Sequence, residues 1–212
     1  IIDGIPVCEG VEDTDGNCYE TIQIGEQLWM AENLKVTHYN NGDEISYPSN
    51  EDFGSFDEGQ YGVYDNDPSN ADIYGNLYNW AVVGDDRGVC PEGFHVPSDG
   101  EWTILTDFIA PEGIESWGNS IAGGKMKESG TEHWYSPNTG ATNESGFTCL
   151  PAGYRNYNNG NFTSMGNFGY FWSSSESSSN YAWNRALYYD YSDVSRGSTN
   201  KLYGFSIRCL GD

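Results

Sequence analysis

Residues 97–111 read Pro-Ser-Asp-Gly-Glu-Trp-Thr-Ile-Leu-Thr-Asp-Phe-Ile-Ala-Pro, and this stretch decides the fold. Ser98 can accept a hydrogen bond from the backbone of Glu101, and the Glu101 side chain can bond back to Ser98, which is the pattern of a capping box. The apolar side chains that follow recur at helical spacing and form one stripe, made of Trp102, Leu105 and Ile109. The pattern predicts a helix over 99–110, ended by the proline that closes the stretch.

The N-terminal part of the chain predicts a hairpin after an extended segment. Residues 19–30 alternate as two short strands do, and Gly25-Glu26 supplies the turn between them. We expect residues 1–18 to form an extended lead-in and residues 19–212 to form a single domain.

The rest of the chain predicts one more helix and then strands alone. Residues 37–73 are polar and rich in Asn, Asp, Gly and Pro, which is typical of a long loop. Residues 74–83 carry apolar side chains at helical spacing, and Gly84 ends this second short helix. The candidate strands that follow are 147–150, 168–174, 181–189 and 203–210. Two short helices followed by a run of antiparallel strands, with long loops, give an α+β fold.

Charge and cysteine content limit the functions that are possible. The formal charge of −23, with 9 Lys and Arg against 32 Asp and Glu, excludes nucleic acid and disfavours an anionic membrane surface. The acidity fits either solubility in a salty exterior or binding of divalent cations. Five cysteines without a Cys-x-x-Cys pair favour an oxidising compartment over a zinc site. No transmembrane run is present, and because the chain begins abruptly at Ile1 we expect that an export segment was removed.

An ordered set of motifs resembles one bacterial family over about residues 13 to 210. The motifs are Asp15-Gly16-Asn17, Gln27-Leu28-Trp29-Met30-Ala31-Glu32-Asn33-Leu34, Tyr74-Gly75-Asn76-Leu77-Tyr78-Asn79-Trp80, the run from Cys90 to Trp102, Leu150-Pro151-Ala152-Gly153-Tyr154-Arg155, Phe171-Trp172-Ser173-Ser174 and Gly204-Phe205-Ser206-Ile207-Arg208-Cys209. Together they resemble the Fibrobacter succinogenes major paralogous domain. Two of them are also similar to formylglycine-generating enzymes, whose fold is a C-type-lectin variant.

The resemblance implies a C-type-lectin-like core, with two short helices around a small, twisted antiparallel sheet. It also implies an exported bacterial protein, lipid-anchored to the outer cell surface in its precursor, with no established activity. By analogy with lectin-like folds, we expect a disulfide between Cys90 and Cys209. A second bridge, between Cys8 and Cys18, would close a short loop in the lead-in, and Cys149 would stay free.

We expect no enzymatic activity. Formylglycine generation needs a close pair of reactive cysteines, whereas the last strand carries only Cys209. The three histidines are scattered, so they do not supply an iron site of the kind found in related oxygenases; they are His38, His95 and His133. Carboxylates are so abundant that a glycosidase-like pair would arise by chance.

Calcium is a possible cofactor at two places. Asp13, Asp15 and Asn17 alternate around a glycine, like the start of an EF-hand loop; the alternative, which the pattern favours, is a simple Asp-Gly turn that leads into a strand. Asp65 and Asp67 form the second cluster, for which a solvated loop is the alternative. The sugar-binding triplets of typical C-type lectins, Glu-Pro-Asn and Gln-Pro-Asp, do not occur.

The C-terminal loops are the candidate binding surface. They are rich in Tyr, Ser and Asn, which antibody paratopes favour because Tyr gives wide contact at low entropy cost. Polar loops that simply cap a β core are the alternative. Within 181–189, Trp183 and Leu187 would face the core and the opposite face would be free; Trp172 is expected to be a core residue rather than a sugar platform. The predicted contact residues are Tyr157, Asn158, Tyr181, Asn184, Tyr188, Tyr189, Tyr191 and Asp193.

These features predict an exported cell-surface recognition module for a glycan or a protein. The alternative is a structural or assembly component of the bacterial cell envelope that binds no small ligand.

Overall fold

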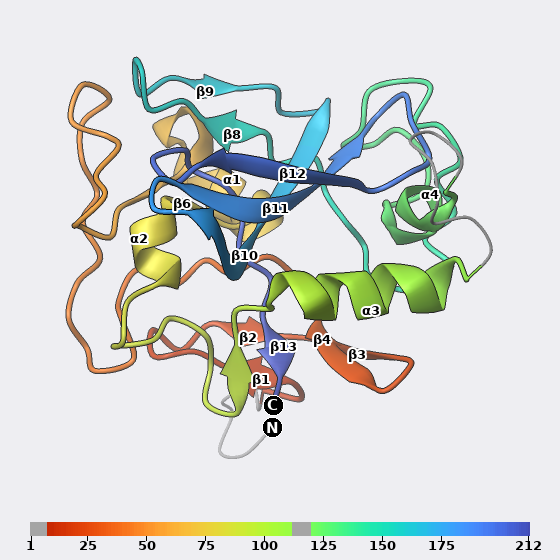
Figure 1. Cartoon of the computed structure of the whole chain (residues 1–212), viewed down its shortest axis with the longest axis horizontal. Coiled ribbons are helices and arrows are strands. Elements are labelled where there is room, and N and C mark those ends of the chain that lie inside the picture. Colours follow the sequence, from red (N-terminus) through yellow and green to blue (C-terminus); the bar gives the residue numbers. More distant parts are fainter. Residues whose placement is uncertain (1–7, 112–119) are drawn as a thin grey trace.

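The computed structural model of the chain describes residues 8–111 and 120–212, and it is an α+β protein (Figure 1). The longest helix, α3 (Asp99–Ile109), lies between two antiparallel sheets. Its Trp102 ring is 4.8 Å from the ring of Trp29 in one sheet and 5.5 Å from that of Phe171 in the other, measured between centroids. The helix therefore joins the two halves of the core.

The sheets are small, and all their strand pairs run antiparallel. One sheet has the order β3-β4-β13-β7, and the other has the order β10-β11-β12. Three two-stranded sheets, β1-β2, β5-β6 and β8-β9, complete the set in the described part of the chain. The strands are β1 (Val11–Glu12), β2 (Cys18–Tyr19), β3 (Thr21–Ile24), β4 (Gln27–Met30), β5 (Tyr61–Gly62), β6 (Leu77–Tyr78), β7 (Phe94–His95), β8 (Tyr154–Arg155), β9 (Phe162–Thr163), β10 (Phe168–Ser178), β11 (Tyr181–Tyr188), β12 (Ser195–Asn200) and β13 (Leu210–Gly211).

The helix predicted from the capping box is confirmed. Ser98 Oγ accepts from the Glu101 backbone N–H at 3.3 Å, and Glu101 Oε2 accepts from the Ser98 N–H at 2.7 Å. The three residues of the apolar stripe are all buried. The predicted hairpin is confirmed as well, since β3 pairs with β4 through a turn at Gly25.

The helix predicted over 74–83 is wrong as a continuous element. The chain forms α1 (Pro68–Tyr74), then β6, and then α2 (Trp80–Val83), which Gly84 caps as expected. Gly75 breaks the helix because its φ is +72° and a side chain there would collide with Asn33. The apolar side chains after it are buried by strand pairing with β5 rather than by a helical face.

Other boundaries also differ from the predictions. The segment 147–150 contains no strand, and within 203–210 only Leu210 lies in one, β13. Strand β12 and helix α4 (Ala122–Met126) were not predicted, because their sequences are rich in Gly, Ser and Asn or are very short. The expected loop over 37–73 includes β5, α1 and a short 3-10 helix at Tyr64–Asn66.

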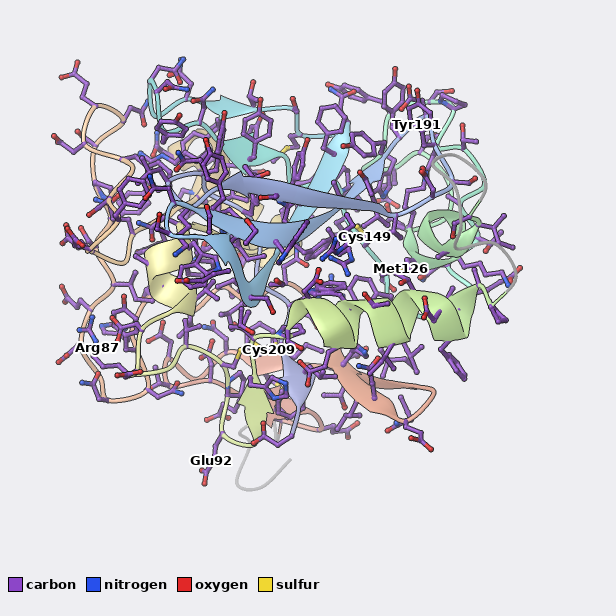
Figure 2. The ribbon with its side chains drawn as sticks, viewed as in Figure 1. Arg87, Glu92, Met126, Cys149, Tyr191 and Cys209 are labelled. Carbon is purple, nitrogen blue, oxygen red and sulfur yellow. A yellow bond between two sulfur atoms is a disulfide. The ribbon has the colours of Figure 1, made fainter. Side chains whose placement is uncertain are left out.

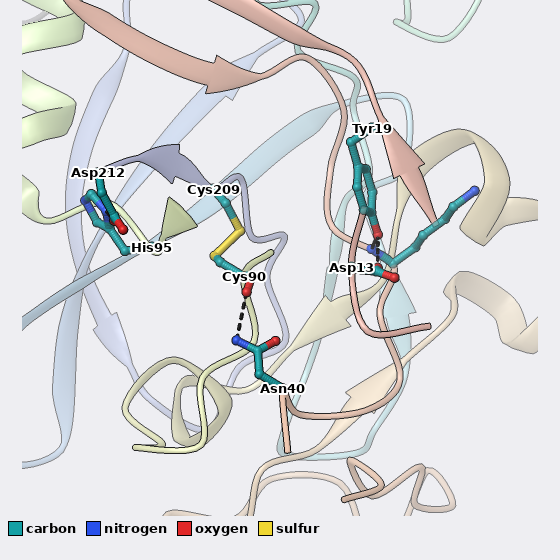
Figure 3. Close-up of a disulfide and its surroundings, with 8 residues drawn as sticks. Asp13, Tyr19, Asn40, Cys90, His95, Cys209 and Asp212 are labelled. Carbon is teal, nitrogen blue, oxygen red and sulfur yellow. Dashed lines mark hydrogen bonds and ion pairs between the residues drawn. A yellow bond between two sulfur atoms is a disulfide. The ribbon is translucent and has the colours of Figure 1, made fainter. Parts of the chain in front are cut away.

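Both expected disulfides are present, and Cys149 is the free, buried cysteine (Figure 2). Figure 3 shows how Cys90–Cys209 joins the segment before β7 to the segment before β13, 119 residues apart in sequence. Cys8–Cys18 closes the loop around β1, within the part of the lead-in that the structure describes. In the described residues, none of the helices has the length and apolar character needed to span a membrane.

Candidate functional site

A row of tyrosine rings crosses the face of the C-terminal sheet that is turned away from α3. Neighbouring centroids along this tyrosine row are 4.9, 5.7, 5.6, 6.5 and 6.0 Å apart. In spatial order the tyrosine row is Tyr157, Tyr203, Tyr154, Tyr170, Tyr188 and Tyr191. Such distances are those of edge-to-face aromatic pairs, so each ring fixes the orientation of the next.

Strand pairing builds the centre of the tyrosine row. β10 and β11 are aligned so that Phe168 lies opposite Tyr188, and their rings meet edge to face at 5.0 Å. Phe205, from the segment beside β10, stacks on Tyr170 at 4.7 Å and on Tyr203 at 5.9 Å. Because Phe205 is buried, it forms an apolar floor under the more exposed tyrosines.

The middle of the row is hollowed. A shallow pocket of about 180 Å³ lies there, and Thr199 adds a hydroxyl to its wall; the lining residues are Tyr154, Tyr170, Thr199, Tyr203 and Phe205. Burial raises the pKa of Tyr170 and of Tyr203 above the usual value for a phenol. Both hydroxyls are therefore neutral at physiological pH, and each can donate as well as accept a hydrogen bond.

A cleft lined by amides adjoins the row at Tyr154. This asparagine cleft has a volume of about 430 Å³, and its lining includes Asn50, Asn66, Asn156, Asn159 and Asn161, together with Asp65, Phe162 and Thr163. Tyr154 lines both the asparagine cleft and the pocket in the row. A ligand that covers the ring of Tyr154 would therefore contact both surfaces.

Arg155 holds the two walls of the asparagine cleft together. Its Nε donates to the carbonyl of Gly160 at 3.1 Å, on the wall that carries Asn156 to Asn161. Its Nη2 donates to Asn50 Oδ1 at 3.2 Å, on the opposite wall. Burial lowers the pKa of Arg155 to about 10, so the guanidinium still carries its charge at neutral pH.

Lys127 holds the turn at the other end of the row. Its ammonium is buried and donates to three backbone carbonyls, those of Thr139 at 3.0 Å, Tyr188 at 2.9 Å and Tyr191 at 2.8 Å. Burial lowers the pKa of Lys127 to about 8. The side chain fixes the backbone between Tyr188 and Tyr191, and with it the position of both rings.

The structure brings together part of the predicted contact set. Tyr157, Tyr188 and Tyr191 lie in the tyrosine row, and Asn158 is exposed next to Tyr157. Tyr181 is 44% exposed but makes no ring contact with another described aromatic residue. The remaining loop residues lie beside the row rather than in it: Tyr189 packs against the core, and Asp193 is half-buried.

Two assignments within β11 need correction. Asn184 is 2% exposed and donates to Thr199 Oγ1 at 2.9 Å, so β12 covers a side chain that was predicted to face a ligand. Trp183 is only partly buried, and the Arg196 guanidinium stacks 3.4 Å above its ring, so it is not a core residue. β11 is the central strand of its sheet, and its neighbours rather than its alternation decide which side chains are covered. Trp172, in contrast, is fully buried as expected.

Three of the four carboxylates considered for calcium are bonded to other protein groups, and Asp15 forms an ion pair with His38 at 2.6 Å. The Asp13 carboxylate accepts from the backbone of Asp15 and Asn17 and from Tyr19 Oη at 2.6 Å, as Figure 3 shows for the tyrosine. Asp67 caps α1 by accepting from the Ser69 backbone at 3.0 Å, and Asp65 lines the asparagine cleft instead. Over residues 8–111 and 120–212 no group of three or more His, Cys, Asp or Glu is placed to hold a metal ion.

Several residues of the site were not predicted from sequence. Tyr154, Tyr170 and Tyr203 form the centre of the row, and Asn50 and Asn66 come from a segment that was predicted to be only a loop. Alternation within β10 could have indicated Tyr170. No local signal places the loop around Asn50 next to residues 156–161, because that contact depends on the buried Arg155.

Comparison with family models gives a match over most of the chain. The family model described as the Fibrobacter succinogenes major domain matches residues 22–210. No curated protein and no solved structure matches the chain.

Proposed function

The chain belongs to the Fibrobacter succinogenes major domain family, and from that premise we propose that it is an exported bacterial cell-surface module that binds a carbohydrate chain. One observation carries this proposal: the tyrosine row and the asparagine cleft form a continuous surface that meets at Tyr154. The two disulfides support an oxidising location, and we propose a lipid anchor in the precursor.

The tyrosine row suits the faces of sugar rings. A tyrosine combines a flat apolar surface with a hydroxyl at its edge, so it can cover the C–H face of a sugar and also bond to its hydroxyl groups. The rings are already held by their neighbours and by Phe205, and little side-chain entropy is lost on binding. Tyr191 is 54% exposed and extends the surface beyond the central pocket.

The asparagine cleft suits hydroxyl groups rather than charged groups. An amide donates two hydrogen bonds and accepts others, which matches a sugar hydroxyl that does both. Asp65 is the one carboxylate among the described residues that line the cleft, and no Lys or Arg is among them. Neutral polar walls next to an aromatic platform favour a neutral carbohydrate over a charged peptide.

We further propose that the domain has a C-type-lectin-like fold and no enzymatic activity. The α+β arrangement and the bridge from Cys90 to the segment before the last strand support the first point. The proposed lack of enzymatic activity is supported by the carboxyl groups of the site. Hydrolysis of a glycosidic bond uses a pair of carboxyl groups about 5 to 10 Å apart. Among the described residues that line the asparagine cleft and the pocket in the tyrosine row, Asp65 is the one carboxylate.

A role in envelope assembly is the second candidate. It is favoured by two apolar side chains on the outer face of α3, Ile104 at 57% and Phe108 at 60% exposure. A patch of this kind could pack against another envelope protein.

A carbohydrate array with the soluble domain tests the proposal. We expect binding to neutral polysaccharides that Tyr203→Ala weakens by about 1–4 kcal/mol, in the range for a central tyrosine in a binding site. Tyr181→Ala is the matched control, because it removes an exposed tyrosine outside the row. If wild type binds no carbohydrate but retains an envelope protein, and Phe108→Ser releases that protein, the assembly role replaces this proposal.

A further inference from the structure

A second cleft, separate from the tyrosine row, lies between the segments around residues 38–47 and 57–61. This acidic cleft has a volume of about 740 Å³. Its lining includes three carboxylates, two tyrosine rings and an imidazole, from Glu44, Asp57, Glu58, Tyr47, Tyr61 and His38. Arg87 lines its edge and is the one Lys or Arg among the described lining residues.

The carboxylates of the acidic cleft are not used by the fold. Glu44, Asp57 and Glu58 are exposed, and in the described part of the chain none of their carboxylates has a hydrogen bond or an ion pair. Three like charges around one hollow repel each other, and a positive ligand group would relieve this repulsion.

Aromatic rings form another part of the lining. Tyr47 is 45% exposed, and its ring centroid lies 4.9 Å from that of Tyr61. Tyr39, which also lines the cleft, is 1% exposed. Its hydroxyl lies against Gly59, where a side chain would collide with it, and interacts with the Asp85 carboxylate.

Arg87 shows which ligand such a set of groups accommodates. Its guanidinium stacks 3.8 Å above the Tyr39 ring, and Asp85 binds it with both carboxylate oxygens, at 2.9 and 2.7 Å. Asp43 adds a third bond at 3.0 Å. The described lining of the acidic cleft also holds the rings of Tyr47 and Tyr61 and three further carboxylates, and Arg87 is its one guanidinium.

We propose that the acidic cleft binds an arginine side chain from a basic peptide segment of a partner protein. A guanidinium is planar, stacks on tyrosine and bonds to carboxylates through a fork of N–H groups. An ammonium group lacks the plane and the fork, so the tyrosine pair would contribute less to its binding. The net charge of −23 would attract a basic segment from a distance.

The acidic cleft is independent of the proposed carbohydrate surface, although the two are near each other at one point. Tyr47 Oη donates to Asn66 Oδ1 at 2.9 Å, and Asn66 lines the asparagine cleft. The edge at Arg87 lies on the opposite side of the molecule from Tyr191 at the end of the tyrosine row (Figure 2). Loss of either function would therefore leave the other measurable.

The test is calorimetric titration of the folded domain with two short peptides that differ only in the central residue, arginine or its uncharged isostere citrulline. We expect the arginine peptide to bind and the citrulline peptide not to bind. Glu44→Gln/Glu58→Gln should lower the affinity for the arginine peptide by about tenfold or more, as the loss of charged hydrogen bonds does. Glu92→Gln/Glu132→Gln is the matched control, since it changes the net charge equally at exposed positions outside the cleft.

Three results would overturn the proposal. Equal binding of the two peptides would show that the guanidinium is not recognised. Equal weakening in both double variants would show a general effect of charge rather than a site. Tighter binding of a glucosamine oligomer than of the arginine peptide would assign the cleft to amino sugars if Glu44→Gln/Glu58→Gln weakens it and Tyr203→Ala does not. Tyr203→Ala should leave arginine-peptide binding unchanged, which separates this site from the carbohydrate surface.

Discussion

At the scale of single residues, Trp172 and Trp183 lie on neighbouring strands and differ in what covers them. Trp172 is fully buried, packs 4.4 Å from Phe205 between centroids and donates from its indole N–H to the Tyr78 carbonyl at 2.8 Å. Trp183 is only partly buried, and its main partner is the Arg196 guanidinium. The packing energy lost on truncation should therefore differ strongly between them.

We predict that Trp172→Ala lowers the free energy of unfolding by about 3–5 kcal/mol, because it opens a cavity and removes the indole hydrogen bond to the Tyr78 carbonyl, which keeps its bond from the Phe205 N–H. Trp183→Ala should lower it by about 1–2 kcal/mol, from a lost cation–π contact and partial burial. Urea denaturation of both variants measures this difference. An equal loss would mean that Trp183 belongs to the core after all.

The second prediction at this scale concerns Cys149. Burial raises the pKa of its thiol to about 12, so almost no thiolate exists at pH 8 and reagents have no access. Iodoacetamide should leave the native protein unmodified and add one label after unfolding without reductant. Mass spectrometry reads both states, and rapid labelling of the native protein would contradict the burial of this residue.

Residue-scale predictions from sequence succeeded where the resemblance to a known fold or the residue type was a sufficient guide. Both disulfides and the buried Trp172 were predicted correctly. Asn184 and Trp183 were assigned wrongly because alternation tells which face a side chain shares, not whether another strand covers that face. Only the position of β12 supplies this information.

At the scale of elements, His95 in β7 contacts both the first turn of α3 and the residue that follows β13. Its Nδ1 lies 2.7 Å from Asp212 Oδ1 at the C-terminus, and its Nε2 lies 3.0 Å from Glu101 Oε1 in the capping box. Burial by itself lowers the pKa of His95, but the bonds to Asp212 and Glu101 outweigh it and leave the pKa above its usual value. The protonated form therefore ties β7, α3 and the chain end together.

A pH dependence follows from this raised pKa. The folded state binds the proton more tightly than the unfolded state, so the stabilisation is complete below the unfolded pKa of about 6.5 and is lost as pH rises through the folded pKa. The difference in unfolding free energy between wild type and His95→Gln should be larger at pH 5.5 than at pH 8.5. A difference that stays constant or grows with pH would contradict the role of His95.

Element-scale prediction worked best for helix α3 and for the β3–β4 hairpin. Each has its capping or turn residues next to its apolar pattern, so local sequence is sufficient. The segment 74–83 failed because β6 is formed by pairing with β5, and this tertiary contact overrides the helical spacing. The asparagine cleft could not be predicted for the same reason, since its walls come from distant segments.

At the scale of the whole molecule, buried cations hold the loops of a strongly acidic chain. Arg155, Arg208 and Lys127 are almost fully buried, and in the described structure they bond to carbonyl and amide oxygens rather than to carboxylates. A net charge of −23 creates a negative potential that lowers the free-energy cost of burying positive groups.

We predict at most a weak effect of calcium on the whole domain. Asp13 is committed to hydrogen bonds in its own turn, and Asp67 caps a helix, so neither cluster offers a free set of ligands. The melting temperature should be nearly the same in chelator and in millimolar calcium. A rise of several degrees with calcium, absent in Asp65→Asn/Asp67→Asn, would show a site that links metal binding to stability.

The central claim is that the tyrosine row and the asparagine cleft bind one carbohydrate together. The most direct measurement is titration of a polysaccharide fragment that binds on the array into four proteins of equal melting temperature: wild type, Tyr157→Ala/Tyr203→Ala, Asn159→Ala/Asn161→Ala, and Tyr181→Ala. We predict that the row variant and the cleft variant each lose about tenfold or more in affinity, while Tyr181→Ala binds as wild type does. Unchanged affinity in either the row variant or the cleft variant would contradict the claim.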